Sequence, residues 1–189
     1  MNTKKEIRKE FLKKRNTLTE EEGKKYSKLV ESQLLSLESY KKADTILIYA
    51  SYQKEVSTYG IIEHALQNNK RVFCPKVFQP GRMEFYEIFS LEDVVCGYKN
   101  IPEPKGETSA FSLSDNNNKN TLIIMPLVGF DVCKNRLGYG GGFYDRYLHR
   151  FSTMERVGLA FECQKYEHKI PTEETDIKPH YIITEQNIY

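Results

Sequence analysis

The sequence predicts an α/β protein with three layers, in which helices cover a mostly parallel sheet. Two short runs, Thr45–Ala50 and Thr121–Met125, are nearly all apolar and rich in β-branched residues, which is typical of strands buried on both faces. A strand–helix–strand order between Thr45 and Cys74 favours parallel pairing. At 189 residues the chain has the length of one domain, so we expect a single domain over residues 1–189.

Two amphipathic helices are expected before the first strand. Residues 3–16 are rich in Lys, Glu and Arg and place two apolar residues four positions apart on one helix face. Thr19 and Glu22 have the spacing of a capping box, and the helical spacing of the apolar residues after them predicts a helix over residues 20–38. Residues 1–42 hold 12 Lys and Arg against 7 Asp and Glu, so the basic excess of the chain lies on these helices.

Helix and strand signals alternate after the first strand. Ser57 or Thr58 can cap a helix whose apolar residues have helical spacing. Arg71–Cys74 is the expected second strand, and a Pro-Gly turn signal precedes a third strand at Met83–Phe89.

The second half of the chain continues the pattern. Residues Ser112–Asn120 are polar and are expected to form a surface loop. After the Thr121–Met125 strand, an aromatic, amphipathic segment predicts a helix at Phe143–Phe151. Two late strands are expected at Val157–Phe161 and Tyr181–Thr184.

The composition excludes several classes of protein. Lys and Arg total 28 and Asp and Glu total 26, a net charge of +2. A dedicated binder of nucleic acid or of membrane surfaces normally carries a large basic excess, so we expect neither partner. The sequence has no run of 18 apolar residues, and its first residues lack the apolar stretch of a secretory signal. We therefore expect a cytoplasmic protein.

The cysteines do not indicate metal or redox chemistry. Cys74, Cys96, Cys133 and Cys163 form no CxxC pair and no cluster with histidine, so a zinc knuckle or a redox motif is not expected. A chain of this size does not need disulfides for stability. We expect four reduced thiols, mostly buried as small core residues.

The strongest local signal is a glycine-rich loop after the Thr121–Met125 strand. Residues 133–142 contain the cations Lys134 and Arg136 and four glycines, and the predicted helix begins directly after them. Glycines let a backbone approach an anion closely, and a helix N-terminus offers free N–H groups with a partial positive charge. Two cations in one loop suit a polyphosphate, so we interpret the loop as a phosphate-binding element.

Two familiar nucleotide signatures do not fit this loop. A Walker A loop needs GK[ST], but Phe143 follows the last glycine, Gly142, and the Rossmann pattern GxGxxG fails at the same phenylalanine. The alternative is a tight turn that only lets a helix pack close to the sheet, although such a turn has no use for Lys134 and Arg136. Asp145 either complements the helix dipole or holds Mg²⁺ beside phosphates, and the residues alone do not separate the two.

The segment RLGYGGGFYDRYL, residues 136–148, resembles the signature of the 5-formyltetrahydrofolate cyclo-ligase (methenyltetrahydrofolate synthetase) family. The family pattern RLGxGxGxYDxxL is met at every fixed position. Further segments are similar in order and spacing, so the resemblance covers essentially the whole chain. They are the pair Lys4 and Arg8, the stretch Ser51–Glu55 with Val56 and Thr58 after it, Ile101–Pro104, and Pro171–Asp176.

The resemblance implies an ATP-dependent reaction and gives these residues roles. 5-Formyltetrahydrofolate and MgATP would yield 5,10-methenyltetrahydrofolate, ADP and phosphate, through phosphorylation of the formyl oxygen and attack by nitrogen 10 of the folate. Arg136 and Lys134 are the expected catalytic residues, and Asp145 and Asp176 the expected Mg²⁺ ligands. The expected ATP contacts are Lys4, Arg8, Arg136, Leu137, Gly138, Tyr139, Gly140, Gly141, Gly142, Phe143 and Tyr144. The expected folate contacts are Ala50, Tyr52, Glu55, Tyr139, Gly140, Gly141, Gly142 and Phe143.

The resemblance also implies a Rossmann-like fold related to sugar-phosphate isomerases and CoA transferases. Two alternatives remain open from the residues. One is an isomerase-like enzyme that works without ATP, in which Lys4 and Arg8 would have no role. The other is a non-catalytic folate or nucleotide binder, against which the carboxylates Asp145 and Asp176 argue. Small molecules are the expected partners, and a monomer is expected.

Overall fold

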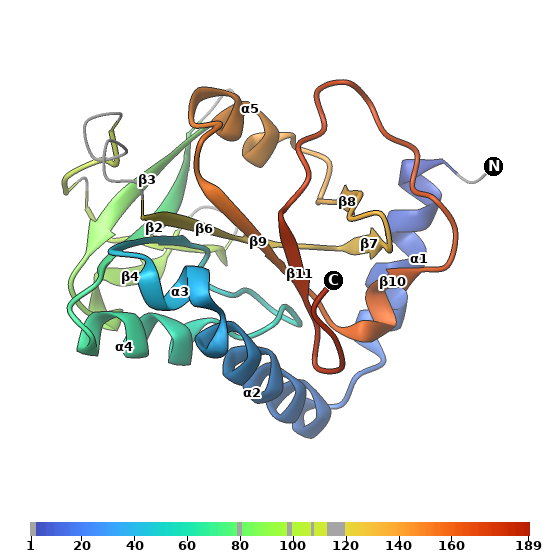
Figure 1. Cartoon of the computed structure of the whole chain (residues 1–189), viewed down its shortest axis with the longest axis horizontal. Helices are drawn as coiled ribbons and strands as arrows, with labels where there is room; N and C mark the ends of the chain where they lie inside the picture. Colours follow the sequence, from blue (N-terminus) through green and yellow to red (C-terminus); the bar gives the residue numbers. More distant parts are fainter. Residues whose placement is uncertain (1–2, 79–80, 98–99, 107, 113–119) are drawn as a thin grey trace.

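The structure of the protein is a computed structural model that describes residues 3–78, 81–97, 100–106, 108–112 and 120–189. Three helices precede the first strand, and helices are interspersed among the strands after it (Figure 1). In chain order the elements are α1 (Lys4–Asn16), α2 (Glu20–Ser36), α3 (Glu38–Lys42), β1 (Thr45–Ile48), α4 (Tyr59–Gln67), β2 (Arg71–Phe78), β3 (Arg82–Ile88), the 3₁₀ helix η1 (Leu91–Asp93), β4 (Val94–Cys96), β5 (Pro102–Pro104), β6 (Thr121–Pro126), β7 (Gly129–Asp131), β8 (Arg136–Leu137), α5 (Phe143–Arg150), β9 (Glu155–Leu159), the 3₁₀ helix η4 (Glu162–Gln164), β10 (Lys165–Tyr166) and β11 (Tyr181–Ile183).

The main sheet has the strand order β11-β9-β6-β1-β2-β3. All neighbouring pairs are parallel except β2 and β3. Residues Thr45–Ile48 of β1 pair in order with Thr121–Ile124 of β6, which are the two apolar runs that the sequence marks as buried strands. The α/β class and the mostly parallel sheet are therefore confirmed.

Helices cover both faces of this sheet, because successive side chains of a strand point to opposite faces. In β1, Ile46 and Ile48 contact the cluster that includes α2, α3 and α4, whereas Leu47 contacts the cluster that includes α5. The residues of β6 alternate in the same way. Figure 1 shows the resulting layers, with α5 on one side of the sheet and α2 to α4 on the other.

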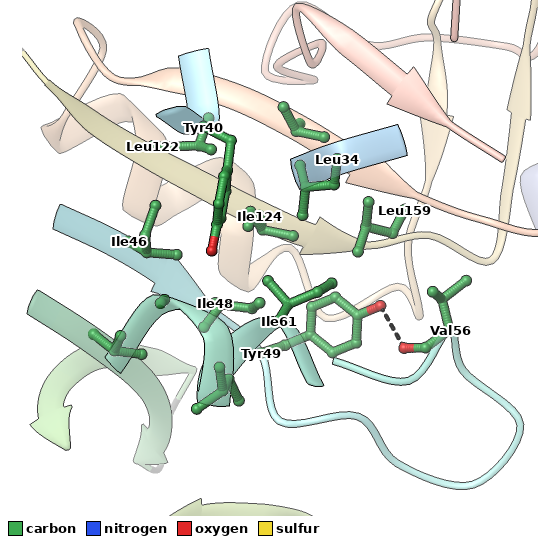
Figure 2. Packing of buried hydrophobic residues seen from close by; sticks show 14 of the residues in the cluster. Leu34, Tyr40, Ile46, Ile48, Tyr49, Val56, Ile61, Leu122, Ile124 and Leu159 are labelled. Atoms are coloured by element: carbon green, nitrogen blue, oxygen red, sulfur yellow. Dashed lines mark hydrogen bonds between the residues drawn. The ribbon is translucent and has the colours of Figure 1, made fainter. Parts of the chain in front are cut away.

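The larger core lies between the sheet and helices α2 to α4. Figure 2 shows Leu34 and Tyr40 packed over the isoleucines of β1 and β6. The Tyr49 hydroxyl donates a hydrogen bond of 2.9 Å to the carbonyl of Val56. This bond closes the loop between β1 and α4, so the core directly fixes the segment that carries Glu55.

Helix α1 packs away from the main sheet, against a small second sheet and the segments beside it. Its Ile7 and Phe11 are fully buried with Val128, Leu137 and Ile170. The strands β10, β7 and β8 form a separate three-stranded sheet next to it, visible in Figure 1. A Cβ atom at Gly129 would lie 2.7 Å from the Phe11 ring, so glycine is needed there for α1 to approach β7.

Several predicted elements differ in extent from those observed. The predicted Val157–Phe161 strand, for example, lies two residues earlier, at Glu155–Leu159. The predicted helix over residues 20–38 ends at Ser36, because Leu37 is extended (φ −66°, ψ 135°) and starts the short helix α3. Strand β2 continues past Cys74 through Pro75 to Phe78. Proline is tolerated there because the register with β1 ends at Phe73, so the missing N–H is not needed on that side.

The helix caps, the cysteines and the predicted loop can also be compared with the structure. Both N-terminal helices begin at capping boxes, at Thr3 and Thr19. All four cysteines are free, but the expectation that they are mostly buried is wrong, since Cys96 and Cys133 are exposed and Cys163 is only partly buried. The predicted loop Ser112–Asn120 lies, except at its two ends, outside the described residues.

No helix among the described residues is long and apolar enough to cross a membrane.

We predict that the buried face of α2 contributes much more stability than its exposed face. Leu34 is fully buried, whereas Leu29 on the same helix is 44% exposed. Leu34→Ala should lower the free energy of unfolding by about 2–5 kcal/mol, because it removes buried methyl groups and leaves a cavity. Leu29→Ala should lower it by about 0.5 kcal/mol or less. Denaturant unfolding of both variants checks this, and equal losses would contradict the packing described here.

Candidate active site

The strand order points to one edge of the sheet as the place for a ligand. Strands β1 and β6 are neighbours at its centre, and the chain continues from β1 toward β2 but from β6 toward β9. In open α/β sheets ligands bind at such a switch point, outside the carboxyl ends of the strands. The segment 49–58 follows β1 at this edge, and the loop that leads to β7, β8 and α5 follows β6.

The segment after β1 is held by hydrogen bonds within itself. Thr58 is the N-cap residue of α4, but its hydroxyl does not cap the helix. Instead it donates to the carbonyl of Tyr49 (2.7 Å) and accepts from the N–H of Ser51 (3.0 Å). Glu55 Oε2 accepts from the N–H of Tyr52 at 2.8 Å. The predicted folate contacts Ala50, Tyr52 and Glu55 therefore lie in one closed turn.

Glu55 meets the glycine-rich loop through a tyrosine. The Tyr139 hydroxyl donates to Glu55 Oε1 at 2.6 Å, across 84 positions of sequence. Burial raises the pKa of Glu55, although the bonds from Tyr139 and the Tyr52 N–H and the charge of Arg15 act in the opposite direction. The structure thus brings together the carboxylate and the loop that the sequence predicts to share a site.

The glycine-rich loop approaches α1 and begins α5. Gly140 (φ +97°) and Gly142 (φ +63°) adopt left-handed conformations, and Gly142 is the N-cap residue of α5, which has no side-chain cap. Arg8 of α1 donates from Nε to the carbonyl of Gly138 at 2.7 Å. The first N–H groups of α5 are therefore not capped by a side chain, and a guanidinium stands beside the loop that leads to them.

Arg136 joins three segments of the chain at this edge. Its Nη2 atom lies 2.5 Å from Oδ1 of Asp145, in the first turn of α5, and its Nε donates to the carbonyl of Ile177 at 2.9 Å. The N–H of Ile177 donates back to Asp145 Oδ1 at 3.0 Å. The Arg136 side chain is only 7% exposed, so its ion pair with Asp145 is largely shielded from solvent.

Lys4 of α1 binds the same C-terminal segment. Its Nζ lies 2.6 Å from Asp176 and 2.9 Å from Glu173. Partial burial acts to raise the pKa of Asp176, but bonds from Lys4 and from the N–H of Glu173 outweigh it and lower that pKa below its ordinary value. Burial acts to lower the pKa of Lys4, but the bonds and charges of Asp176 and Glu173 outweigh it and raise that pKa.

The two predicted metal ligands lie next to each other in this network. Asp145 accepts from the N–H of Ile177, the residue that follows Asp176. Each carboxylate uses one oxygen for the bonds described above, which leaves Oδ2 of Asp145 and Oδ1 of Asp176 without a hydrogen bond to any residue that the structure describes. Within the described residues, no group of three or more His, Cys, Asp or Glu side chains has the arrangement of a metal site.

Lys134 is not part of the hydrogen-bonded group formed by Arg136, Asp145 and Ile177. It adopts a left-handed conformation (φ 60°) in the turn between β7 and β8, and its Nζ donates to the carbonyl of His180 at 2.9 Å. The ammonium is thus bound to backbone at the C-terminal segment. Its predicted catalytic role stays a prediction.

Asp131 was not predicted as a site residue, although it holds two segments of the site together. Asp131 is 1% exposed. Its carboxylate accepts from the N–H groups of Cys133 (2.9 Å), Asn135 (2.9 Å) and Ile170 (2.8 Å), and from the Asn135 side chain (2.7 Å). It therefore fixes the turn before Arg136 to the start of the segment that carries Asp176. The aspartate of a short Asx turn is the one signal for it in the sequence.

A cavity of about 550 Å³ opens beside Glu55. It lies between the beginning of α2 and residues 53–57, and Thr19, Lys24, Gln53, Lys54 and Phe161 are among the residues that line it. A bulky organic molecule that reached Glu55 would have room to extend here.

Comparison with known proteins decides the family. A model of the 5-formyltetrahydrofolate cyclo-ligase family matches residues 1–185. The chain belongs to this family. It is 30% identical over 181 residues to the 5-formyltetrahydrofolate cyclo-ligase of Escherichia coli K12, covering 93% of this chain and 97% of that one. It is 34% identical over 184 residues to the Haemophilus influenzae enzyme of the same name, covering 94% and 96%.

Two solved structures support the same assignment. The 5,10-methenyltetrahydrofolate synthetase of Aquifex aeolicus superposes with a TM-score of 0.83 at 33% identity, over 98% of this chain and 91% of that one. The synthetase from Mycoplasma pneumoniae gives a TM-score of 0.75 at 26% identity, over 96% and 98%. The fold is thus that of the cyclo-ligase family. The wider relation to sugar-phosphate isomerases and CoA transferases and the single-domain organisation stay predictions.

We predict that Asp131 is the main structural anchor of the site in this cyclo-ligase family member. Asp131→Ala leaves four donors, three of them buried, without their acceptor and should lower the free energy of unfolding by roughly 3 kcal/mol or more. Asp93 serves as the control, because its partly exposed carboxylate also accepts two backbone N–H bonds (2.8 and 3.1 Å). Asp93→Ala should lower that energy by only about 1 kcal/mol. Similar losses in denaturant unfolding would show that the Asp131 network is no more important than an ordinary surface turn.

Proposed function

We propose that the chain catalyses the ATP-dependent closure of 5-formyltetrahydrofolate to 5,10-methenyltetrahydrofolate, with release of ADP and phosphate. The observation that carries the proposal is the contact between Tyr139 and Glu55. This contact joins the glycine-rich loop to a carboxylate that would suit the N–H edge of a pterin. The membership of the chain in the cyclo-ligase family supports the proposal.

The chemistry needs positioning and charge stabilisation more than a reactive side chain. The formyl oxygen attacks the γ-phosphorus of ATP, and the bond between that phosphorus and the bridging oxygen of ADP breaks. Nitrogen 10 then attacks the formyl carbon, its proton leaves, and the carbon–oxygen bond breaks to release phosphate. Phosphoryl transfer of this kind is accelerated by holding the reactants in line and by neutralising charge on the transferred group.

The ATP end of the site would be formed by α1 and the glycine-rich loop. Arg8 of α1 stands beside this loop, and Lys4 of the same helix binds Glu173 and Asp176 in the C-terminal segment. The N–H groups of residues 136–144 lie along the loop and the first turn of α5. Arg136 would bind the transferred phosphoryl group as the catalytic cation. In the ligand-free protein, Lys4 and Arg136 are bound to Asp176 and Asp145, so phosphate oxygens would compete with carboxylates for both cations.

The folate end would be formed by the turn after β1 and the same loop. Glu55 would accept hydrogen bonds from the pterin, with Ala50 and Tyr52 in the same turn and the loop residues Tyr139, Gly140, Gly141, Gly142 and Phe143 opposite. Because the Tyr139 hydroxyl occupies Glu55 Oε1 in the free protein, the pterin would have to displace it. The cavity beside Glu55 would then receive the remainder of the folate.

Asp145 and Asp176 fit a magnesium ion that arrives with ATP. They lie together, and each has one oxygen that makes no hydrogen bond to the described residues. Mg²⁺ usually takes one or two carboxylates together with phosphate oxygens and water. When bound, Mg²⁺ would neutralise charge on the phosphates. Two carboxylates alone, each paired with a cation, form a weak site for the free metal.

Lys134 would act as a second catalytic cation only after leaving the His180 carbonyl. We place it second to Arg136 for that reason. We further propose that the protein works as a monomer in the cytoplasm, on small molecules alone.

The proposed reaction is tested by incubating the purified protein with 5-formyltetrahydrofolate and MgATP. The absorbance of the methenyl product and the release of ADP should rise together, in a one-to-one ratio. Without ATP, or with an analogue whose γ-phosphate cannot be transferred, no methenyl product should form. Product without ATP would favour an isomerase-like activity, and ligand binding without product would favour a non-catalytic binder.

We predict that Arg136 stabilises the transition state. Arg136→Ala removes a charge-assisted contact of about 1.5–3 kcal/mol and should lower kcat/KM roughly 10- to 150-fold. The control is Arg150→Ala, because Arg150 lies at the other end of α5 in an exposed ion pair with Glu84. That variant should retain activity within about twofold. Steady-state kinetics on variants shown to be folded by circular dichroism checks this, and full activity of Arg136→Ala would remove the residue from catalysis.

We predict that Asp145 and Asp176 serve the same Mg²⁺. Asp145→Asn should raise the Mg²⁺ concentration for half-maximal activity, with partial rescue by high Mg²⁺ or by Mn²⁺, because the ion keeps other ligands. Asp176→Asn should have a milder effect of the same kind. Calorimetry adds a readout besides turnover: each variant should weaken the binding of MgATP more than that of metal-free ATP. An equal weakening of both would show that the carboxylates do not bind the metal.

A further inference from the structure

Arg15, in the last turn of α1, is a buried cation that the proposed mechanism does not use. It is only 3% exposed. Its Nε and Nη1 atoms are buried and have no hydrogen-bond partner among the residues that the structure describes. A buried, incompletely bonded charge is destabilising. Its presence in this place therefore indicates a role other than stability.

The surroundings of Arg15 connect it to the folate end of the site. Its guanidinium carbon lies 5.7 Å from the centroid of the Tyr139 ring, over the ring face. The hydroxyl of the same ring binds Glu55. The charge of Arg15 also acts on the Glu55 carboxyl directly, where it lowers the pKa against the effect of burial.

We propose that Arg15 is a positioning residue of the folate site, which holds Tyr139 by stacking and keeps Glu55 as a carboxylate. This inference rests on the proposed function. Arg15 does not touch the reacting atoms. It acts through Tyr139 and Glu55, which would contact the pterin.

The need for such a cation follows from the chemistry of Glu55. A carboxylate accepts hydrogen bonds with both oxygens, whereas a protonated carboxyl presents a donor and loses that ability. Burial favours the protonated form. The positive charge of Arg15 opposes the protonation of Glu55, and it remains in place when the pterin displaces the Tyr139 hydroxyl.

The cavity beside Glu55 is also lined by the charged residues Glu20, Lys24 and Lys54. Four phenols face Glu55 as well. Tyr49, Tyr59, Tyr139 and Tyr144 all sense its charge, and burial raises the pKa of each of them. They therefore stay neutral near pH 7, and Glu55 is the group among them that changes charge below it. Removing Arg15 raises the pKa of Glu55 further. Folate-dependent activity, which needs the carboxylate, should then be lost at a higher pH as the pH falls.

The test compares Arg15→Met, which keeps the apolar stem without the charge, with Arg15→Lys, which keeps a charge. In Arg15→Met we expect kcat/KM for 5-formyltetrahydrofolate to fall about 10-fold or more, and its acid limb to move to higher pH. The KM for ATP should stay within about twofold. Arg15→Lys should restore most of the folate kcat/KM and return the acid limb toward its original position.

The control for a general loss of packing is Arg71→Met. Arg71 also stacks on an aromatic ring, with its guanidinium 4.9 Å from the Phe73 centroid, but lies where β1 and β2 begin, at the opposite edge of the sheet. This variant should shift neither the KM for folate nor the acid limb.

A second comparison, made in a variant without the Glu55 carboxyl, separates a positioning role of Arg15 from a purely structural role. In Glu55→Gln, which has no titrating carboxyl, adding Arg15→Met should lower kcat/KM by less than about threefold and should not move the pH profile. A full additional 10-fold loss there, an unmoved profile in the single variant, or an equal rise of both KM values would overturn the proposal. Failure of the proposed function is distinguishable, because then the wild-type protein itself would form no methenyl product.

Discussion

The ion pair between Arg136 and Asp145, completed by the backbone of Ile177, is the constraint on which the rest of the site depends. It links β8, the first turn of α5 and the C-terminal segment, which are far apart in the sequence. A buried ion pair adds little net stability, because desolvation offsets the attraction. What it does here is fix geometry: the glycine-rich loop is held at both ends, so its N–H groups and the free N-terminus of α5 keep one orientation.

The position of α1 extends this constraint to the other side of the loop. Phe11 packs against Gly129, where no side chain would fit, and this contact sets the distance of the helix from β7. Arg8 and Lys4, one and two turns earlier, then reach Gly138 and Asp176, while Arg15, one turn later, reaches Tyr139. A single helix thus places its cations along both halves of the proposed site, and the apolar face of the helix decides where they stand.

The sequence was sufficient for most of the fold but for less of the site. The apolar runs of β1 and β6 and the capping box at Thr19 each carry a local pattern, and each was correctly predicted. The capping box at Thr3 was not predicted, and the phosphate-binding role of the glycine-rich loop stays a prediction. Strands β4, β5, β7, β8 and β10 carry no such pattern, because they have two or three residues and exist only through their partners. Asp131 and Arg15 were missed for the same reason: a buried charge is defined by what packs around it, and a lone Arg or Asp in a charged segment resembles a solvated residue.

Cations gather at the proposed site, and the carboxylates paired with them balance their charge. Lys4 and Arg136 would repel each other in a partly buried space, but each is paired with a carboxylate, so the group as a whole is close to neutral. In the proposed reaction MgATP supplies four negative phosphate charges and one divalent cation as a unit. In that proposal the phosphates would replace the carboxylates at Lys4 and Arg136, and Asp145 and Asp176 would then be free to hold the metal, so that no charge would be left unpaired. ATP without metal would leave Asp145 and Asp176 unpaired, and metal without ATP would compete with Lys4 and Arg136 for the two carboxylates. The proposed site would therefore favour binding of nucleotide and metal together over either one alone.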